Sequence, residues 1–212
     1  MNPSEKSNTE MSYDAVAEEY AQKFLGELAH KPFDRNLLDT LASRWVGKGR
    51  VCDIGTGPGQ VARYLYDRGV EVCGLDLSAA LVEQARQAHP GIEFNQGDMR
   101  QLEFADGSLI GITAFYSIIH IEREGVTAVL REWWRVLQPG GAVVLAFHQG
   151  QEVRHLEEWW GKAVNVDFVF FERDEMVGYL NEAGFTVEQV LERGPIPDVE
   201  AQTERLYIVA VK

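Results

Sequence analysis

The segment that decides the fold is Val51-Cys52-Asp53-Ile54-Gly55-Thr56-Gly57-Pro58-Gly59-Gln60. An apolar run ends there in an acid, and glycines follow at every second position. Because glycine has no Cβ, such a turn can take positive φ angles and bring its backbone amides close to a ligand. A helix is expected directly after the turn, from Val61 to Arg68, with its N-terminal end at the same place. The segment therefore predicts a buried strand, a tight turn and a helix that share a ligand site.

The spacing of the glycines separates two kinds of nucleotide site. A dinucleotide-binding turn follows G-x-G-x-x-G, and Gln60 occupies the place of its third glycine. Asp53 with Gly55, Gly57 and Gly59 instead resembles the acid-x-G-x-G-x-G loop, motif I, of class I S-adenosylmethionine-dependent methyltransferases. The resemblance implies that these four residues bind the methionine end of S-adenosylmethionine, whose product is S-adenosylhomocysteine. A tight turn without a ligand is the alternative.

Short apolar runs alternate with helical patterns from Arg50 to Ala146, which is typical of parallel strands joined by helical crossovers. The resemblance implies an α/β fold: a Rossmann-like, doubly wound, seven-stranded, mostly parallel sheet with an antiparallel last strand, helices on both faces and an N-terminal helical lid. Strands are expected at 50–54, 71–75, 92–95, 109–115, 142–147, 185–191 and 206–211. Further helices are expected at 34–45, 79–88, 126–137 and 173–183, the first capped by Asp34 and the last ended by Gly184.

An amphipathic helix is expected near the N-terminus. Its Y-D-x-x-A-x-x-Y pattern, formed by Tyr13, Asp14, Ala17 and Tyr20, resembles the lid of small-molecule methyltransferases. The resemblance implies that Tyr20 closes over the cofactor, whereas the helical spacing alone favours a packed aromatic stripe. We expect one methyltransferase domain over 1–212, in which 1–33 form a tail and lid helix and 148–172 form a substrate-side insertion.

The second expected strand ends at Asp76, which Leu77 follows. Ligands bind parallel sheets at the carboxyl ends of the strands, where the strand order reverses, so Asp76 should lie beside the glycine turn. Its two carboxylate oxygens could accept both ribose hydroxyl protons, and Leu77 is assigned to the same cofactor site. The alternative is that Asp76 caps the next helix, although Ser78 is better placed to do so.

Two further segments carry the resemblance. Gly97-Asp98-Met99 is similar to the family's adenine-binding triplet, which implies that Asp98 takes the exocyclic amine and Met99 contacts the ring. Phe115 and Tyr116 stand where the family contacts the methionine ammonium, and Leu137 to Gly141 resembles its L-x-P-G-G turn. The residue types alone also fit a turn aspartate beside a buried methionine. The family's usual acid at the start of the fourth strand is replaced by Gly111 or Thr113.

Two histidines are candidates for proton transfer. His120 follows the fourth strand and His148 the fifth, and histidine can change protonation near neutral pH, so either could take a proton from an acceptor. His120 could equally be a structural histidine bonded to a backbone carbonyl. The insertion that begins at His148 carries two tryptophans that could wall an apolar pocket. The spacing of His148, Glu152 and His155 is weak evidence for a metal, and we predict none.

The composition limits the partners. The chain has 212 residues and a formal net charge of −13, without a block of Lys or Arg, so a nucleic-acid partner is not expected. No stretch is apolar enough to span a membrane, and the N-terminus is polar, which predicts a soluble cytoplasmic protein, monomeric or homodimeric. Cys52 and Cys73 are expected as buried core residues.

Together these features predict methyl transfer from S-adenosylmethionine to a small-molecule acceptor, most naturally at oxygen or nitrogen. Three alternatives remain: a cofactor-binding module without catalysis, a protein or RNA methyltransferase, and an NAD(P)-dependent oxidoreductase. Gln60 argues against the last of these, and the acidic balance argues against an RNA substrate.

Overall fold

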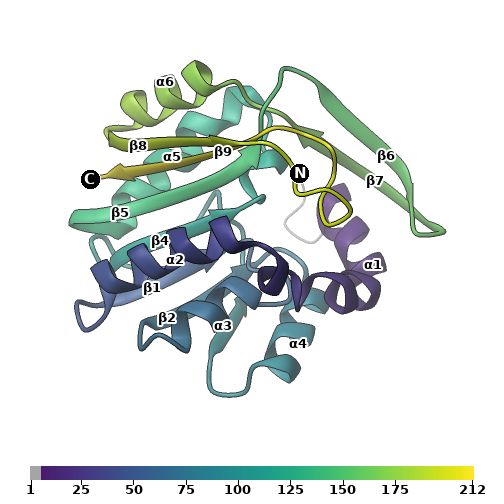
Figure 1. Ribbon diagram of the computed structural model, residues 1–212, viewed down its shortest axis with the longest axis horizontal. Helices are drawn as coiled ribbons and strands as arrows, with labels where there is room; N and C mark the ends of the chain where they lie inside the picture. The colour runs from purple at the N-terminus through teal and green to yellow at the C-terminus, as the bar shows by residue number, and fades with distance from the viewer. Residues whose placement is uncertain (1–5) are drawn as a thin grey trace.

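A seven-stranded sheet forms the centre of the computed structural model, which describes residues 6–212 (Figure 1). The strand order is β3-β2-β1-β4-β5-β9-β8. β9 runs antiparallel to both of its neighbours, and the other pairs are parallel, as predicted. The strands are β1 (Arg50–Ile54), β2 (Glu71–Asp76), β3 (Glu93–Gln96), β4 (Leu109–Phe115), β5 (Leu137–His148), β8 (Thr186–Arg193) and β9 (Arg205–Val211).

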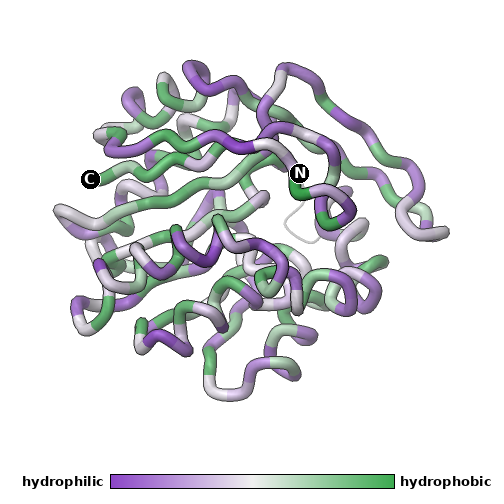
Figure 2. Tube along the Cα trace, viewed as in Figure 1, coloured by the Kyte–Doolittle hydropathy of each residue, from purple (hydrophilic) through white to green (hydrophobic). Residues whose placement is uncertain are grey.

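Helices cover both faces of this sheet. The long helices are α1 (Asn8–Phe24), α2 (Pro32–Trp45), α3 (Gln60–Tyr66), α4 (Ala79–Ala88), α5 (Arg123–Val136) and α6 (Arg173–Ala183), with short 3-10 turns η1 (Glu27–His30) and η2 (Ile118–His120). Side chains of α2, α3 and α4 pack in one core cluster and those of α5 and α6 in another, so the sheet separates two apolar layers. In Figure 2 the central strands are mostly hydrophobic, while hydrophobic and hydrophilic residues alternate along the outer helices. Alternate residues of one strand feed opposite layers, as the pleat requires.

The strand order reverses between β1 and β4, and the carboxyl ends of the parallel strands open at that edge. Cys52 and Cys73 are paired neighbours in β1 and β2, and both are free and buried, as expected. Ser78 caps α4 by accepting a hydrogen bond from the Leu81 amide, and Gly184 ends α6 in the left-handed conformation. These caps confirm two of the predicted helix boundaries.

Some expected boundaries are wrong. α2 begins at Pro32, and Asp34 does not cap it: the Asp34 carboxylate is 1% exposed and accepts hydrogen bonds from Tyr207 and Arg193. A proline at the first helical position needs no amide partner, which explains the earlier start. β5 begins earlier than expected, at Leu137, which pairs with Leu109 of β4. Pro139 to Gly141 lie within the strand, where the register against β4 shifts before Ala142 pairs with Gly111.

A two-stranded ribbon was not predicted. β6 (Val153–Trp159) and β7 (Lys162–Val169) form an antiparallel hairpin within the expected insertion. In Figure 1 it extends from the edge of the sheet toward α1. Within residues 6–212, no helix combines the length and the hydropathy needed to cross a membrane.

Candidate active site

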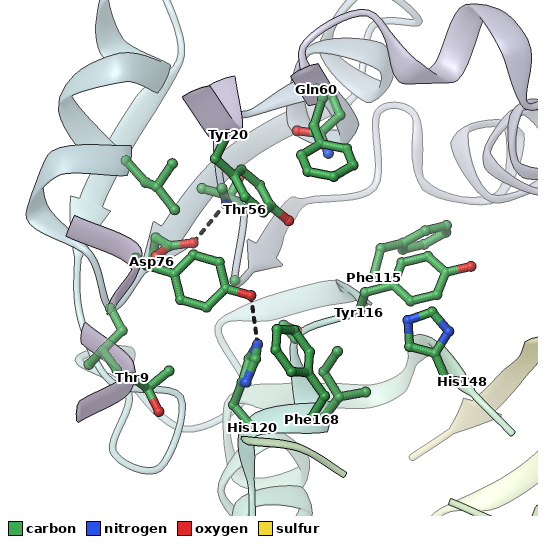
Figure 3. Close-up of a pocket in the computed structure, with 18 of the residues that line it drawn as sticks. Thr9, Tyr20, Thr56, Gln60, Asp76, Phe115, Tyr116, His120, His148 and Phe168 are labelled. Carbon is green, nitrogen blue, oxygen red and sulfur yellow. Dashed lines mark hydrogen bonds between the residues drawn. The ribbon is translucent and has the colours of Figure 1, made fainter. Parts of the chain in front are cut away.

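A cavity of about 820 Å³ opens at the carboxyl ends of the parallel strands. Its walls come from the segments after β1, β2, β3 and β4, from α1 and η1, and from the β6–β7 hairpin and the loop between β8 and β9. Figure 3 shows side chains from these separate segments pointing toward the same space. The volume lies in the upper part of the range typical of small-molecule sites.

The glycine turn forms one wall of the cavity. Gly55, Gly57 and Gly59 have φ angles of 68°, 55° and 86°, in the left-handed region that glycine adopts without strain. A Cβ on Gly55 would lie 2.2 Å from Cβ of Ser117, so the turn packs directly against the segment after β4. Gly55 and Gly57 line the cavity. Gly59 lies behind it, where a Cβ would meet His89 and Phe94 at 2.8 Å.

Asp53 also lies behind the cavity wall. Its side chain accepts hydrogen bonds from the hydroxyls of Thr56 and Thr113, each at 2.6 Å, and the residue is 2% exposed. Burial raises the pKa of Asp53 to about 6, although both hydroxyls oppose that shift. Asp53 therefore holds the glycine turn against β4. Thr113 is one of the two residues that replace the family's usual acid, and Gly111, the other, leaves room for the Trp45 ring.

Asp76 links the glycine turn to the helix that follows it. Its carboxylate accepts hydrogen bonds from the backbone amides of Gly57 at 2.7 Å and Ser78 at 2.9 Å. Burial raises the pKa of Asp76 to about 6, with the two amides opposing. Asp76 and Leu77 both line the cavity, and Ser78 rather than Asp76 caps α4. The capping alternative for Asp76 is thus excluded.

The expected adenine residues belong to the lining of the same cavity. Asp98 and Met99 both line it. Partial burial alone would raise the pKa of Asp98, but hydrogen bonds from Arg100 lower it, so the carboxylate is ionised. The Met99 carbonyl accepts the indole N–H of Trp133, which fixes the loop on α5.

Phe115 is the last residue of β4, Tyr116 follows it, and both line the cavity. Tyr116 has a φ of 55°, an unusual value for a residue with a Cβ. Its hydroxyl is hydrogen-bonded to that of Tyr207 at 3.2 Å, and Tyr207 in turn donates to the buried Asp34. This chain of contacts holds the Tyr116 ring in place, and burial raises its pKa to about 12.

His120 reaches the cavity through a tyrosine. Its Nδ1 lies 2.8 Å from the carbonyl oxygen of Asp167, which can only accept, so Nδ1 carries the proton. Nε2 then accepts the hydroxyl of Tyr13 at 2.8 Å (Figure 3). Burial lowers the pKa of His120 to about 4, so the ring is neutral. The hydrogen bond from His120 to a backbone carbonyl, which was the structural alternative, is therefore present. Tyr13 is bonded to the other ring nitrogen, the one that would have taken a proton from the methyl acceptor.

His148 is arranged differently. Its Nδ1 is hydrogen-bonded to the Thr203 hydroxyl at 2.8 Å, and its ring stacks on Phe170 and packs against Tyr116. Burial, and secondarily the charge of Arg205, lower the pKa of His148 to about 4. The residue lines the cavity, and within residues 6–212 its Nε2 has no hydrogen-bond partner. Of the two histidines, only His148 keeps a ring nitrogen without a hydrogen-bond partner among the described residues.

Three cavity residues were missed by sequence reasoning. Lys31 and Glu27 form an ion pair at 2.6 Å, and Gln60 donates its amide N–H to the same Glu27 at 2.9 Å. The side-chain oxygen of Gln60 is buried without a partner, which marks a place for a ligand donor. The four-residue spacing of Glu27 and Lys31 is typical of a helical ion pair, but nothing in it indicates a ligand.

Aromatic rings close the cavity from the α1 side. Tyr13 and Tyr20 lie 5.4 Å apart, and the Trp159 ring packs edge-on against both. The Tyr20 ring is also within 3.6 Å of the place where Gly57 would carry a Cβ. α1 is fastened to the hairpin, since the Asn165 amide donates to Ser12 and Lys162 donates to the Ala15 carbonyl.

Comparison with known proteins gives the family. A methyltransferase domain family matches residues 51–141, from β1 into β5. Residues 51–141 therefore form a methyltransferase domain, of the class I S-adenosylmethionine-dependent type. The chain is 36% identical over 112 residues to a demethylmenaquinone methyltransferase of Beutenbergia cavernae. The aligned residues make up 53% of this chain and 45% of that protein.

Other members of the class I methyltransferases are similar over longer stretches. Malonyl-[acyl-carrier protein] O-methyltransferase of Enterobacter lignolyticus is 26% identical over 162 residues, 76% of this chain and 61% of that one. The chain thus spans about half the length of these two curated relatives. A S-adenosylmethionine-dependent methyltransferase of Methanosarcina mazei shares the fold, with a TM-score of 0.71, 18% identity and coverage of 81% of this chain and 96% of that one.

The cofactor of class I methyltransferases is S-adenosylmethionine, and the cavity fits it. The unpartnered oxygen of Gln60 suits an ammonium donor, Lys31 suits a carboxylate, and Asp76 suits hydroxyl groups. Within the described part of the chain, no group of three or more His, Cys, Asp or Glu side chains could hold a metal ion.

Proposed function

We propose that this protein transfers a methyl group from S-adenosylmethionine to a small-molecule acceptor, at oxygen or nitrogen. The observation that carries the proposal is one cavity whose lining includes both Gln60 with Glu27 and Lys31, which suit an amino acid, and the Asp98-Met99 loop. Such a cavity matches a nucleoside joined to an amino acid. Phosphate would be a poor ligand beside Asp76 and Glu27, because like charges repel.

Nine of the cofactor residues predicted from the sequence line the cavity, and we propose that they contact the cofactor. Asp76 with Leu77 would hold the ribose, and Asp98 with Met99 the adenine. Tyr20, Gly55, Gly57, Phe115 and Tyr116 would surround the methionine portion. Asp53 and Gly59 keep a supporting role in this proposal, since they shape the glycine turn from behind. This completes the assignment of the predicted cofactor residues.

The amino-acid end of the cofactor is assigned to residues that the sequence motifs did not indicate as cofactor contacts. We assign the cofactor carboxylate to Lys31 and its ammonium to Gln60 and Glu27. Lys31 is 6% exposed, so its charge acts in a low-dielectric setting. Gln60 is already oriented by its bond to Glu27, which leaves its oxygen directed to a ligand.

When bound, S-adenosylmethionine supplies a methyl group activated by a positively charged sulfur. The protein's contribution is to align an acceptor with that group and exclude water. His148 is proposed to receive a proton from the acceptor, because its neutral ring presents Nε2 to the cavity. His120 is proposed to act through Tyr13, whose hydroxyl it orients.

Membership of the family does not specify the methyl acceptor. The relatives named above are a demethylmenaquinone methyltransferase and a malonyl-[acyl-carrier protein] O-methyltransferase, so their names point to different acceptors. For this chain we propose a free small molecule, a monomer or homodimer in the cytoplasm, one domain over 1–212, and no nucleic-acid or membrane partner. The net charge of −13 supports the absence of nucleic acid. A cofactor-binding module without catalysis is the second candidate.

The cofactor assignment is tested by calorimetry with S-adenosylhomocysteine and with 5′-methylthioadenosine, which lacks the amino-acid end. Gln60→Leu should weaken S-adenosylhomocysteine binding roughly tenfold to a hundredfold, since a hydrogen bond to a charged group contributes about 1.5–3 kcal/mol. Binding of methylthioadenosine should not change. Gln87→Leu is the matched control, because Gln87 bonds only Glu83 on the exposed side of α4.

If Gln60→Leu weakened the binding of S-adenosylhomocysteine and of methylthioadenosine by the same factor, the assignment of the amino-acid end would be contradicted. Binding of NADH without binding of S-adenosylhomocysteine would contradict the proposed function. Catalysis is tested separately, by release of S-adenosylhomocysteine with phenols, amines, carboxylates and thiols, and by the product masses. Cofactor binding without turnover on any acceptor class would favour the binding module.

A further inference from the structure

Backbone strain is concentrated at the cavity. Among residues 6–212, the non-glycine residues with positive φ are Tyr116, Trp160 and Asp198, at 55°, 52° and 60°. All three line the cavity. Left-handed backbone is costly for a residue with a Cβ, and such residues cluster where ligands bind. Tyr116 belongs to the cofactor site, which leaves Trp160 and Asp198 to be explained.

Trp160 is an unfavourable residue for its turn. The β6–β7 turn consists of Trp160 and Gly161, with φ angles of 52° and 79°, the pattern of a type I′ hairpin turn. Asn or Asp before glycine is strongly preferred there, because both residues need positive φ. Burial in the core does not account for the tryptophan, since the residue is 39% exposed. The unfavourable turn residue instead places an indole ring in the lining of the cavity.

Apolar rings surround Trp160 at the mouth. Its ring centroid lies 5.0 Å from that of Trp159, and 6.4 Å from those of Tyr20 and Phe24 on α1. We call these four residues the aromatic rim. Across the mouth, the loop between β8 and β9 contributes Val199, which is 41% exposed. The rim therefore offers flat apolar surface to a ligand that enters from solvent.

The charge at the rim narrows the ligand class. The ammonium of Lys23 lies 5.3 Å from the centroid of the Trp160 ring. A second cation on this ring would compete with Lys23 and be repelled by it. The rim is therefore suited to a neutral ring system rather than to a quaternary or protonated amine.

We propose that the aromatic rim binds the methyl acceptor, and that this acceptor carries a neutral, flat, apolar ring system. The ring system stacks on Trp160, and its reacting atom points inward toward His148. This inference rests on the proposed function, because the rim borders the cofactor cavity.

The test is calorimetry on protein saturated with S-adenosylhomocysteine, with three bicyclic probes of similar size. 2-Naphthol is flat and neutral, N-methylquinolinium is flat and cationic, and decahydro-2-naphthol is neutral but not flat. The wild type should bind 2-naphthol at least tenfold more tightly than either of the other two. Trp160→Asn should weaken 2-naphthol binding roughly tenfold, and Trp160→Phe by less, because a ring remains.

Stability separates recognition from packing. Asn fits the turn, so the melting temperature of Trp160→Asn should stay within about 3 °C of the wild type. Trp134→Gln is the control for loss of a tryptophan, because Trp134 is 38% exposed on α5 and does not line the cavity. It should leave 2-naphthol binding unchanged.

Three results would overturn the inference while leaving the proposed function intact. They are S-adenosylhomocysteine binding without 2-naphthol binding, equal affinity for naphthol and the quinolinium cation, and unchanged naphthol affinity in both Trp160 variants. Failure of S-adenosylhomocysteine to bind would instead contradict the proposed function itself.

Discussion

Tyr13 and His120 show how a single hydrogen bond can decide the role of a residue. The Asp167 carbonyl fixes the proton of His120 on Nδ1, so the Tyr13 hydroxyl must donate to Nε2. Burial raises the pKa of Tyr13 well above its usual value, which keeps the phenol protonated. The oxygen of Tyr13 is then an oriented acceptor at the edge of the cavity, and the histidine serves to hold it there.

We therefore predict that Tyr13→Phe and His120→Ala reduce turnover by similar factors, roughly tenfold or more, while affinity for S-adenosylhomocysteine falls much less. The double variant should be no worse than the single ones, since both remove the same hydrogen bond. The measurement is a double-mutant cycle of kcat on an acceptor found in the release assay. Additive losses would show that the two residues act independently.

Residue motifs located part of the cavity lining in advance. Asp76 ends β2, and Asp98 and Met99 follow β3; such strand ends are predictable because glycines and apolar runs mark them. Glu27 and Lys31 could not be assigned in this way. Their position depends on how η1 packs across the cavity, and this is a tertiary relation that no local spacing encodes.

At the scale of elements, α1 and the β6–β7 hairpin act as one cover over the cavity. The Ser12 hydroxyl accepts from the Asn165 amide at 2.9 Å and donates to the Asn8 carbonyl at 2.7 Å. The Lys162 ammonium adds bonds to Ala15 and Glu19. Opening the cavity on this side requires these bonds to break together, which makes the cover a cooperative unit.

Ser12→Ala should loosen this cover. The Asn165 amide would lose its partner, and we expect faster hydrogen exchange along β7 and a loss of about 1 kcal/mol in unfolding free energy. Ser43→Ala is the control, because Ser43 also donates to the carbonyl four residues back, that of Asp39, but lies exposed on α2. Hydrogen exchange followed by mass spectrometry distinguishes the two. Equal protection of β7 in Ser12→Ala and wild type would contradict the cooperative cover.

The hairpin is also where sequence reasoning stopped. Its strands are mostly exposed and carry many charges, so no apolar face distinguished them from a loop. The turn gave no help, since Trp160 is not a usual residue at its position. The sheet, by contrast, was predicted strand by strand, because its central strands are buried between two helical layers and therefore appear as apolar runs.

At the scale of the whole molecule, two buried carboxyl groups and two half-buried imidazoles oppose one another in their response to pH. Burial raises the pKa of Asp53 and of Asp76 to about 6, from 3.8. The folded state therefore holds more protons than the unfolded state, and stability falls as pH rises from about 4 to about 6. Burial lowers the pKa of His120 and of His148 to about 4, from 6.5, so their effect has the opposite sign.

We predict that these contributions nearly cancel in the wild type between pH 4.5 and 6.5, and that removing one histidine exposes the effect of the acids. Relative to the wild type, His148→Gln should gain about 2–3 kcal/mol in unfolding free energy on going from pH 7 to pH 4.5. Urea denaturation at the two pH values measures the difference. A constant offset between the two proteins would show that His148 titrates normally.

The aromatic rim also has an optical consequence. Trp159 and Trp160 lie with ring centroids 5.0 Å apart and planes inclined by 36°. Indole transitions this close couple, so the pair should give bands of opposite sign in circular dichroism. Any molecule that inserts at the mouth changes this coupling without a dye or label. The protein thus carries its own spectroscopic reporter of whether the entrance to its site is occupied.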